Sequence, residues 1–322
     1  MSTSPGLLTP RVLIAFLFVT LIWGSTWIVI KGQLGTVPPP WSVTYRFLIG
    51  AAVMFAYAAL RRERLMLSGR AWGFAALLGI AQFAFNFNFL YRAEQHITSG
   101  LAAVLFALLI VPNTLLGRLF LKSPVERRFL AGAGIAIVGV GMMIAHEYRA
   151  AALGADEVLV GTALALAGVL SASTANVMQG TRLARAQSMV VMIAWAMLFG
   201  ALGNAGYAGI TAGAPTAEPT ATYIGGLLYL GVIASALTFP LYFSIIRHVG
   251  PGQAAWSSVL IPIIAMAIST GLENYRWAPL SIAGAAVALA GLVIAVIKRP
   301  ARPSVSGGNL VSVPVEGGAS PR

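Results

Sequence analysis

Long apolar runs follow one another along the chain, and charged residues, proline or glycine separate them. A helix needs about 20 residues to cross the hydrocarbon core of a bilayer, and these runs have that length. The strands of a membrane barrel would instead show short segments in which apolar and polar positions alternate. The pattern predicts transmembrane helices, ten in number, at residues 11–31, 40–60, 72–91, 97–120, 128–146, 159–180, 187–208, 222–246, 252–271 and 277–297.

The two halves of this pattern resemble each other at a shift of 152 residues, so that Leu78-Gly79 align with Leu230-Gly231. Small residues supply most of the further matches, and chance similarity is therefore the alternative. A shift of five helices inverts the second half in the membrane, as in many secondary transporters. We therefore expect two inverted five-helix repeats around a central cavity. The predicted parts are 11–146, 159–297 and a disordered cytoplasmic tail, 300–322.

The last predicted helix of each repeat is rich in glycine, with Gly132, Gly134 and Gly139 in the first and Gly284 and Gly291 in the second. Glycine at such spacing lets two membrane helices approach closely. We expect the fifth and tenth helices to pack against each other and to brace the two halves.

Composition supports the membrane prediction, because 58% of the residues are hydrophobic and only 9% are charged. A soluble domain has about 25% charged residues, so this chain could not cover a water-facing surface with polar groups. Lipid requires the backbone to satisfy its own hydrogen bonds, and we therefore expect an all-α integral membrane protein. The chain has no cysteine, which excludes disulfides and cysteine-based metal sites.

The basic residues predict how the chain lies in the membrane. The net charge of +12 would suit a nucleic-acid partner, but the basic residues are scattered between apolar runs and form no patch, so we expect no nucleic acid. Lys and Arg concentrate in cytoplasmic loops. With both termini in the cytoplasm, the outer face carries few of them, namely Lys31, Arg92, Arg149 and Arg276. This distribution predicts a multi-pass membrane protein with both termini in the cytoplasm.

The beginning of the chain carries a recognisable series of residues. The first predicted helix contains Trp23-Gly24-Ser25 and ends at Lys31, and Arg46-Phe47 lie at the start of the second. This series resembles the opening of the EamA-type domain of the drug/metabolite transporter superfamily. The short joint between the third and fourth helices and Pro112 are also similar to that family.

The resemblance implies a transport function. Family members often carry Glu after the fourth and ninth helices; here Glu273 matches the second position, whereas Leu121-Lys122 occupy the first. Within the family, the chain is most similar to bacterial exporters of amino acids, and of aromatic amino acids in particular. The resemblance implies efflux from the cytoplasm across the inner membrane by alternating access.

Aromatic and amide side chains lie deep in several predicted helices. Trp23 and Trp27 are four residues apart and share a helix face, and both packing and cavity lining explain them. Gln82 and Asn86 share a face of the third helix. Amides in hydrocarbon are costly unless they are paired, so they either line a cavity or clamp two helices together.

These residues define a candidate substrate site. An apolar, aromatic pocket with a few amide and hydroxyl groups suits an amino acid, with an aromatic or aliphatic body and a zwitterionic head. Arg46 either contacts a carboxylate or snorkels and pairs structurally. Each proline inside a helix removes a hydrogen bond, which serves gating or a structural kink, and Pro240 and Pro262 are the gating candidates. The predicted substrate-binding residues are Trp23, Trp27, Gln82, Phe83, Asn86, Phe87, Tyr91, Asn176, Gln179, Phe239, Tyr242 and Trp256.

No Asp or Glu falls inside the ten predicted helices. Proton-driven antiport usually needs an acidic residue within the membrane, so the sequence favours a uniporter or an exchanger of neutral amino acids. Efflux of drugs or other metabolites, with or without proton coupling, is the alternative. The sequence shows no nucleophile and base pair, no metal-ligand spacing and no cofactor fingerprint. We therefore expect no enzyme activity, no cofactor and no metal, and a monomer whose partners are a small-molecule substrate and the lipid bilayer.

Overall fold

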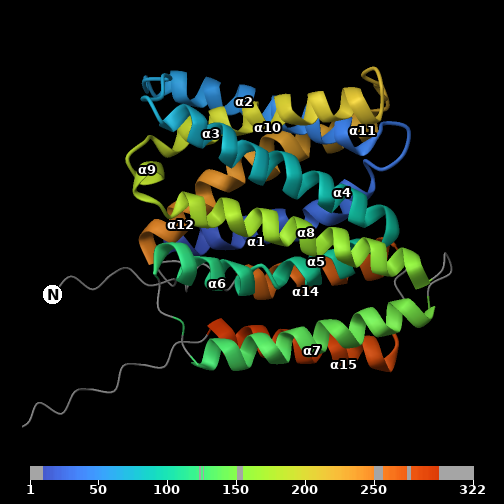
Figure 1. Cartoon of the computed structure of the whole chain (residues 1–322). Helices are drawn as coiled ribbons and strands as arrows, with labels where there is room; N and C mark the ends of the chain where they lie inside the picture. The colour runs from blue at the N-terminus through green and yellow to red at the C-terminus, as the bar shows by residue number, and fades with distance from the viewer. Residues whose placement is uncertain are drawn as a thin grey trace, which may run out of the picture.

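The computed structural model describes residues 10–122, 125, 127–150, 155–249, 257–273 and 277–296. Within these residues the chain is helical and contains no strand, and the long helices lie beside one another in stacked layers (Figure 1). The predicted tail, 300–322, and Trp256 lie outside the described residues. The elements are α1 (Pro10–Lys31), α2 (Pro39–Leu60), α3 (Ala71–Gly79), η1 (Ile80–Phe85), α4 (Asn86–His96), α5 (Ser99–Ala107), α6 (Ile110–Leu121), α7 (Arg127–Ala150), α8 (Ala155–Gln179), α9 (Arg182–Arg185), α10 (Met189–Thr211), α11 (Ala221–Leu228), η2 (Tyr229–Leu237), α12 (Thr238–Val249), α14 (Ser257–Leu272) and α15 (Pro279–Val296).

Many of the helical segments are long and apolar enough to cross a membrane. In the described part of the chain, 8 helical stretches meet both requirements, and Leu260–Leu272 and Pro279–Ala295 are shorter apolar helices. Large apolar side chains such as Ile210 (88% exposed) and Leu119 (69% exposed) face outward, where only lipid can accommodate so much apolar surface. The protein is therefore an all-helical, multi-pass membrane protein.

The third membrane helix is longer than the sequence pattern indicated. It runs without a break through α3, η1 and α4 to His96, whereas the prediction ended it at residue 91. The sequence pattern predicts a loop at the charged residues Arg92 and Glu94. Glu94 is instead fully buried, because a membrane bundle can shelter an ionisable group that faces its interior. The joint consists of Ile97, which is extended, and Thr98, whose side chain accepts a hydrogen bond from the Leu101 amide at 3.3 Å.

The fourth membrane helix is divided into α5 and α6. Pro112 has no amide proton to donate to the carbonyl of Leu108. The Val111 amide bonds to Leu108 instead, at 2.8 Å, and the backbone tightens over one turn. The predicted helix therefore has a break near its middle.

A wide, π-type turn occurs in two membrane helices. It forms η1 between α3 and α4, and η2 between α11 and α12. Thr238, the first residue of α12, donates its hydroxyl to the carbonyl of Ile233 in η2 at 2.7 Å, and Pro240 follows two residues later. Such π segments occur frequently at functional sites.

Helices α7 and α15 pack closely side by side (Figure 1). A Cβ atom built on Gly139 would lie 2.2 Å from the backbone nitrogen of Ala288, and one on Gly132 would lie 2.4 Å from that of Ala295. The backbones therefore touch along a path that only glycine permits. The predicted packing of the fifth and tenth helices is confirmed.

Candidate functional site

A cavity of about 150 Å³ lies inside the helical bundle. Its walls come from α1, η1, α4, α5, α8, α12 and α14, and α2 contributes Arg46. Residues from distant parts of the chain therefore meet at one place. The predicted site residues that line it are Trp23, Trp27, Gln82, Asn86, Phe87, Asn176, Phe239, Tyr242 and Pro262.

Four other predicted residues lie elsewhere in the described structure. Phe83 is buried behind the wall, where its ring packs 5.3 Å from that of Phe239. Tyr91 is buried on α4 and Gln179 ends α8, and neither lines the cavity. Pro240 lies in α12 between the lining residues Phe239 and Tyr242 but is not part of the wall itself.

Aromatic rings form the apolar part of the wall. The Trp23 ring lies 5.5 Å from that of Phe239 and 4.9 Å from that of Tyr242, and the Trp27 ring lies 5.2 Å from that of Phe106. The Trp23 Nε1 also donates to the Ala234 carbonyl at 3.2 Å. Trp23 therefore both packs against its neighbours and faces the cavity, and it links α1 to η2.

Several polar atoms of residues in the same wall lack a hydrogen-bond partner in the described part of the chain. They are two donors, Trp27 Nε1 and Arg46 Nη1, and two acceptors, Gln82 Oε1 and Asn86 Oδ1. Buried polar groups without partners are rare because each costs free energy. A wall that brings donors and acceptors together in this way can bind a ligand with both an acidic and a basic group.

Arg46 is held inside the bundle and does not snorkel to the surface. Its side chain is 2% exposed, and its Nε donates to the Ser235 Oγ at 3.1 Å. The guanidinium carbon lies 4.3 Å from the centre of the Phe87 ring and 5.2 Å from that of Phe47. These cation–π contacts and the hydrogen bond to Ser235 hold the group in place. The snorkelling alternative is therefore wrong, although the group does pair with Ser235.

The deep amides of the third helix serve two different purposes. Gln82 and Asn86 face the cavity, and the Asn86 Nδ2 donates to the Gln82 main-chain carbonyl at 3.3 Å. Asn88 points to another side, where it donates to the Asn204 side chain of α10. Asn204 in turn donates to the Phe83 carbonyl at 2.9 Å. Asn88 is thus an interhelical clamp, whereas the other two amides line the cavity.

Glu94 is an acidic residue that sequence reasoning placed outside the membrane helices. The expectation that no acidic residue lies within a helix was therefore wrong, since Glu94 lies in α4 and is 0% exposed. Lys31, at the end of α1, donates to the main-chain carbonyl of Glu94. The pairing between Lys31 and α4 depends on tertiary contacts, so no local signal in the sequence could have found it.

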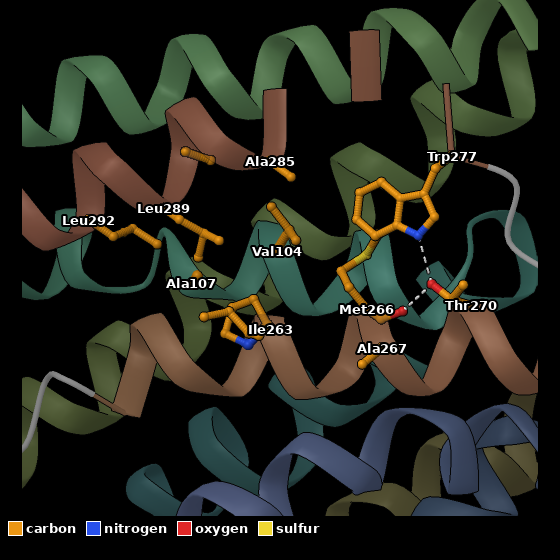
Figure 2. A pocket seen from close by; sticks show the side chains of 12 residues that line it. Val104, Ala107, Ile263, Met266, Ala267, Thr270, Trp277, Ala285, Leu289 and Leu292 are labelled. Atoms are coloured by element: carbon orange, nitrogen blue, oxygen red, sulfur yellow. Dashed lines mark hydrogen bonds between the residues drawn. The ribbon is translucent and has the colours of Figure 1, made fainter. Parts of the chain in front are cut away.

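A second, larger cavity of about 480 Å³ lies between α5, α14 and α15 (Figure 2). Its lining is almost wholly apolar, with side chains such as Val104 and Leu289. Its few polar groups bond among themselves, since Trp277 Nε1 donates to Thr270 Oγ1 at 2.8 Å and Thr270 donates to the Met266 carbonyl at 2.7 Å. This cavity offers no recognition for a polar substrate, so the first cavity is the candidate site.

Comparisons with known proteins agree with a membrane transporter. A probable amino-acid metabolite efflux pump of Salmonella typhimurium is 27% identical over 301 residues, which cover 89% of this chain and 97% of that protein. An uncharacterized inner membrane transporter of Escherichia coli, YedA, is 28% identical over 299 residues, covering 89% and 92%. These names indicate a transporter and not an enzyme.

The comparison with a solved structure and the comparison with a family model agree with each other. A crystal structure of a protein with 20% sequence identity superposes with a TM-score of 0.65 and covers 88% of this chain and 95% of that chain, which shows a common fold. The model of the EamA-like transporter family matches twice, at residues 10–145 and 159–297. The chain therefore belongs to the EamA-like transporter family.

Proposed function

We propose that this transporter exports neutral and aromatic amino acids from the cytoplasm through the cavity described above. The observation that carries the proposal is the set of unpartnered donors and acceptors, Trp27, Arg46, Gln82 and Asn86, between aromatic walls. The similarity to a protein named as an amino-acid metabolite efflux pump supports the same substrate class.

The chemistry of these groups matches an amino acid at each end. The Arg46 guanidinium and the Trp27 N–H donate to the substrate carboxylate, a charge-assisted interaction at the arginine. The carbonyl oxygens of Gln82 and Asn86 accept from the substrate ammonium group. The side chain of the substrate then lies against rings such as Tyr242, where aromatic surfaces stack favourably.

The same wall disfavours the alternative of cationic drug efflux. Arg46 contributes a guanidinium cation to the wall, and among the described residues no acidic side chain lines the cavity. A lipophilic cation would meet the positive charge of the Arg46 guanidinium in the wall, and like charges in a partly buried site repel each other. Export of neutral metabolites with a carboxylate remains compatible with the wall.

We propose that ten membrane helices form two inverted repeats, at 11–146 and 159–297. Equivalent glycines support this symmetry. A Cβ on Gly79 would lie 2.2 Å from the Ala196 carbonyl of α10, and one on Gly231 would lie 2.8 Å from Ile49 of α2. The third helix of each half thus touches the second helix of the other. Both termini face the cytoplasm, and the protein acts as a monomer by alternating access.

Transport by purified protein in proteoliposomes tests the proposal. Vesicles loaded with unlabelled substrate should take up radiolabelled Phe, Trp or Thr by counterflow, and protein-free vesicles should not. A cationic dye should not compete. Absence of protein-dependent counterflow for all of these amino acids, or competition by the dye alone, would contradict the proposed substrate class.

A further inference from the structure

Glu94 is a buried acidic residue that substrate binding does not use. It is 0% exposed, and neither oxygen of its carboxyl group has a hydrogen-bond partner among the residues that the structure describes. It lies one helical turn beyond Leu90, which lines the cavity, and Lys31 follows Ile30, which also lines it. The carboxyl group is therefore close to the substrate path without being part of its wall.

Charged groups on three other segments of the chain interact electrostatically with Glu94. Lys31 of α1 donates its ammonium protons to the main-chain carbonyls of Glu94 and of Ile97, the latter at 3.1 Å. Arg46 of α2 and Glu273, just after α14, lie within electrostatic reach. Arg46 is bonded to Ser235 and stacked on Phe87. None of these groups donates a hydrogen bond to the Glu94 carboxyl group.

Glu273 already has its partners. Its oxygens accept from the Ser99 main-chain amide at 3.3 Å and from the hydroxyls of Ser99 and Ser269. It therefore caps the N-terminus of α5, where a negative charge is favourable. Tyr91, three residues before Glu94 on α4, interacts electrostatically with Arg46 and with Glu94. Of the two carboxyl groups, only that of Glu94 has no hydrogen-bond partner among the described residues.

Two arrangements of this cluster are compatible with its surroundings. An ionised carboxylate without a donor is costly inside a low-dielectric bundle, whereas the protonated acid is neutral and costs far less. When the proton leaves, the Lys31 ammonium, which already donates to the main-chain carbonyl of Glu94, is the cation that we expect to turn to the carboxylate. Lys31 ends α1, and α1 carries Trp23 and Trp27 on the cavity wall. Gain or loss of the proton therefore changes the contact that holds the end of α1 against α4, and α1 lines the cavity.

We propose that Glu94 is a proton-binding site that couples amino-acid export to proton entry, with Lys31 as the partner of the ionised form. The Glu94 carboxyl binds a proton from water on the outer side and releases it to water on the cytoplasmic side, while the substrate moves outward. This proposal rests on the proposed export function. It replaces uniport or exchange, which followed from the supposed absence of an intramembrane acid.

Proteoliposome transport with the variant Glu94→Gln tests the coupling. The matched control is Glu157→Gln, because Glu157 bonds to His96 at the same end of the bundle but its side chain is 45% exposed. Wild type and Glu157→Gln should accumulate radiolabelled Phe when a pH gradient is imposed. Glu94→Gln should lose this accumulation entirely and keep counterflow at equal pH on both sides.

The outcomes separate the two proposals. If wild-type protein shows no counterflow of any amino acid, the export function fails. If counterflow is present but a pH gradient drives no accumulation, or if Glu94→Gln still responds to the gradient, proton coupling by Glu94 is overturned. Should Glu94→Gln fail to fold, as judged by size-exclusion chromatography, Glu94→Asp replaces it. That variant should shift the pH dependence of accumulation, and a pH dependence identical to wild type overturns the proposal.

Discussion

Among single residues, Arg46 carries the largest share of the proposed substrate recognition. It is the buried cation of the cavity wall, and its Nη1 is without a partner in the protein. A hydrogen bond to a charged group contributes about 1.5–3 kcal/mol. We therefore expect Arg46→Lys, which keeps the charge but loses the planar fork, to raise the apparent KM for Phe about tenfold or more. Transport kinetics in proteoliposomes measure this change.

The variant Ser235→Ala is a matched control that distinguishes substrate recognition by Arg46 from a structural role of Arg46. Ser235→Ala removes the 3.1 Å bond to Arg46 Nε but leaves the guanidinium in the wall. We expect it to alter KM much less than Arg46→Lys. Phenylalanine amide lacks the carboxylate and carries only the ammonium group, so it should be a much weaker substrate, and Arg46→Lys should change its KM far less than that of Phe. Equal effects of Arg46→Lys on Phe and on its amide would assign Arg46 a structural role only.

Among the helices, the pair formed by α7 and α15 depends on glycine. A methyl group on Gly139 would lie 2.2 Å from a backbone nitrogen of α15, so Gly139→Ala must push the helices apart. Overpacking of this kind costs about 1–3 kcal/mol. Gly134, on the same helix, has no atom within 4 Å of such a methyl group, so Gly134→Ala should be neutral or slightly stabilising.

Thermal unfolding of the detergent-solubilised variants measures this difference. We expect a lower midpoint for Gly139→Ala and a midpoint at or above wild type for Gly134→Ala. If both variants unfolded at the wild-type temperature, the close contact between α7 and α15 would not be a determinant of stability.

For the whole molecule, the predicted orientation can be tested cleanly because the chain has no cysteine. Ser68 lies between α2 and α3, Ala217 lies between α10 and α11, and both are exposed. Lys and Arg in the loops place Ser68 in the cytoplasm and Ala217 outside. In cells with a permeabilised outer membrane, a membrane-impermeant maleimide should label Ala217→Cys and not Ser68→Cys. The reverse labelling would invert the topology and the direction assigned to the proton.

The sequence by itself determined that this is a helical membrane protein of the EamA type, because apolar run length, low charge content and the Trp23 to Phe47 series are local properties of the chain. The local pattern also predicts that Gln82 and Asn86 share a helix face, because helical periodicity is enough to show which residues lie on the same side of a helix. Their role in the substrate site remains a prediction.

Only the tertiary structure decided which polar residues are buried and with what. Asn88 and Asn86 look alike in sequence, yet one clamps α4 to α10 and the other lines the cavity. Glu94 reads as a loop residue because charge normally marks the end of a membrane helix. It is buried within α4, where α1 supplies Lys31 to the main chain beside it. The energy of a buried polar group depends on partners from distant segments, and those partners exist only once the bundle has assembled.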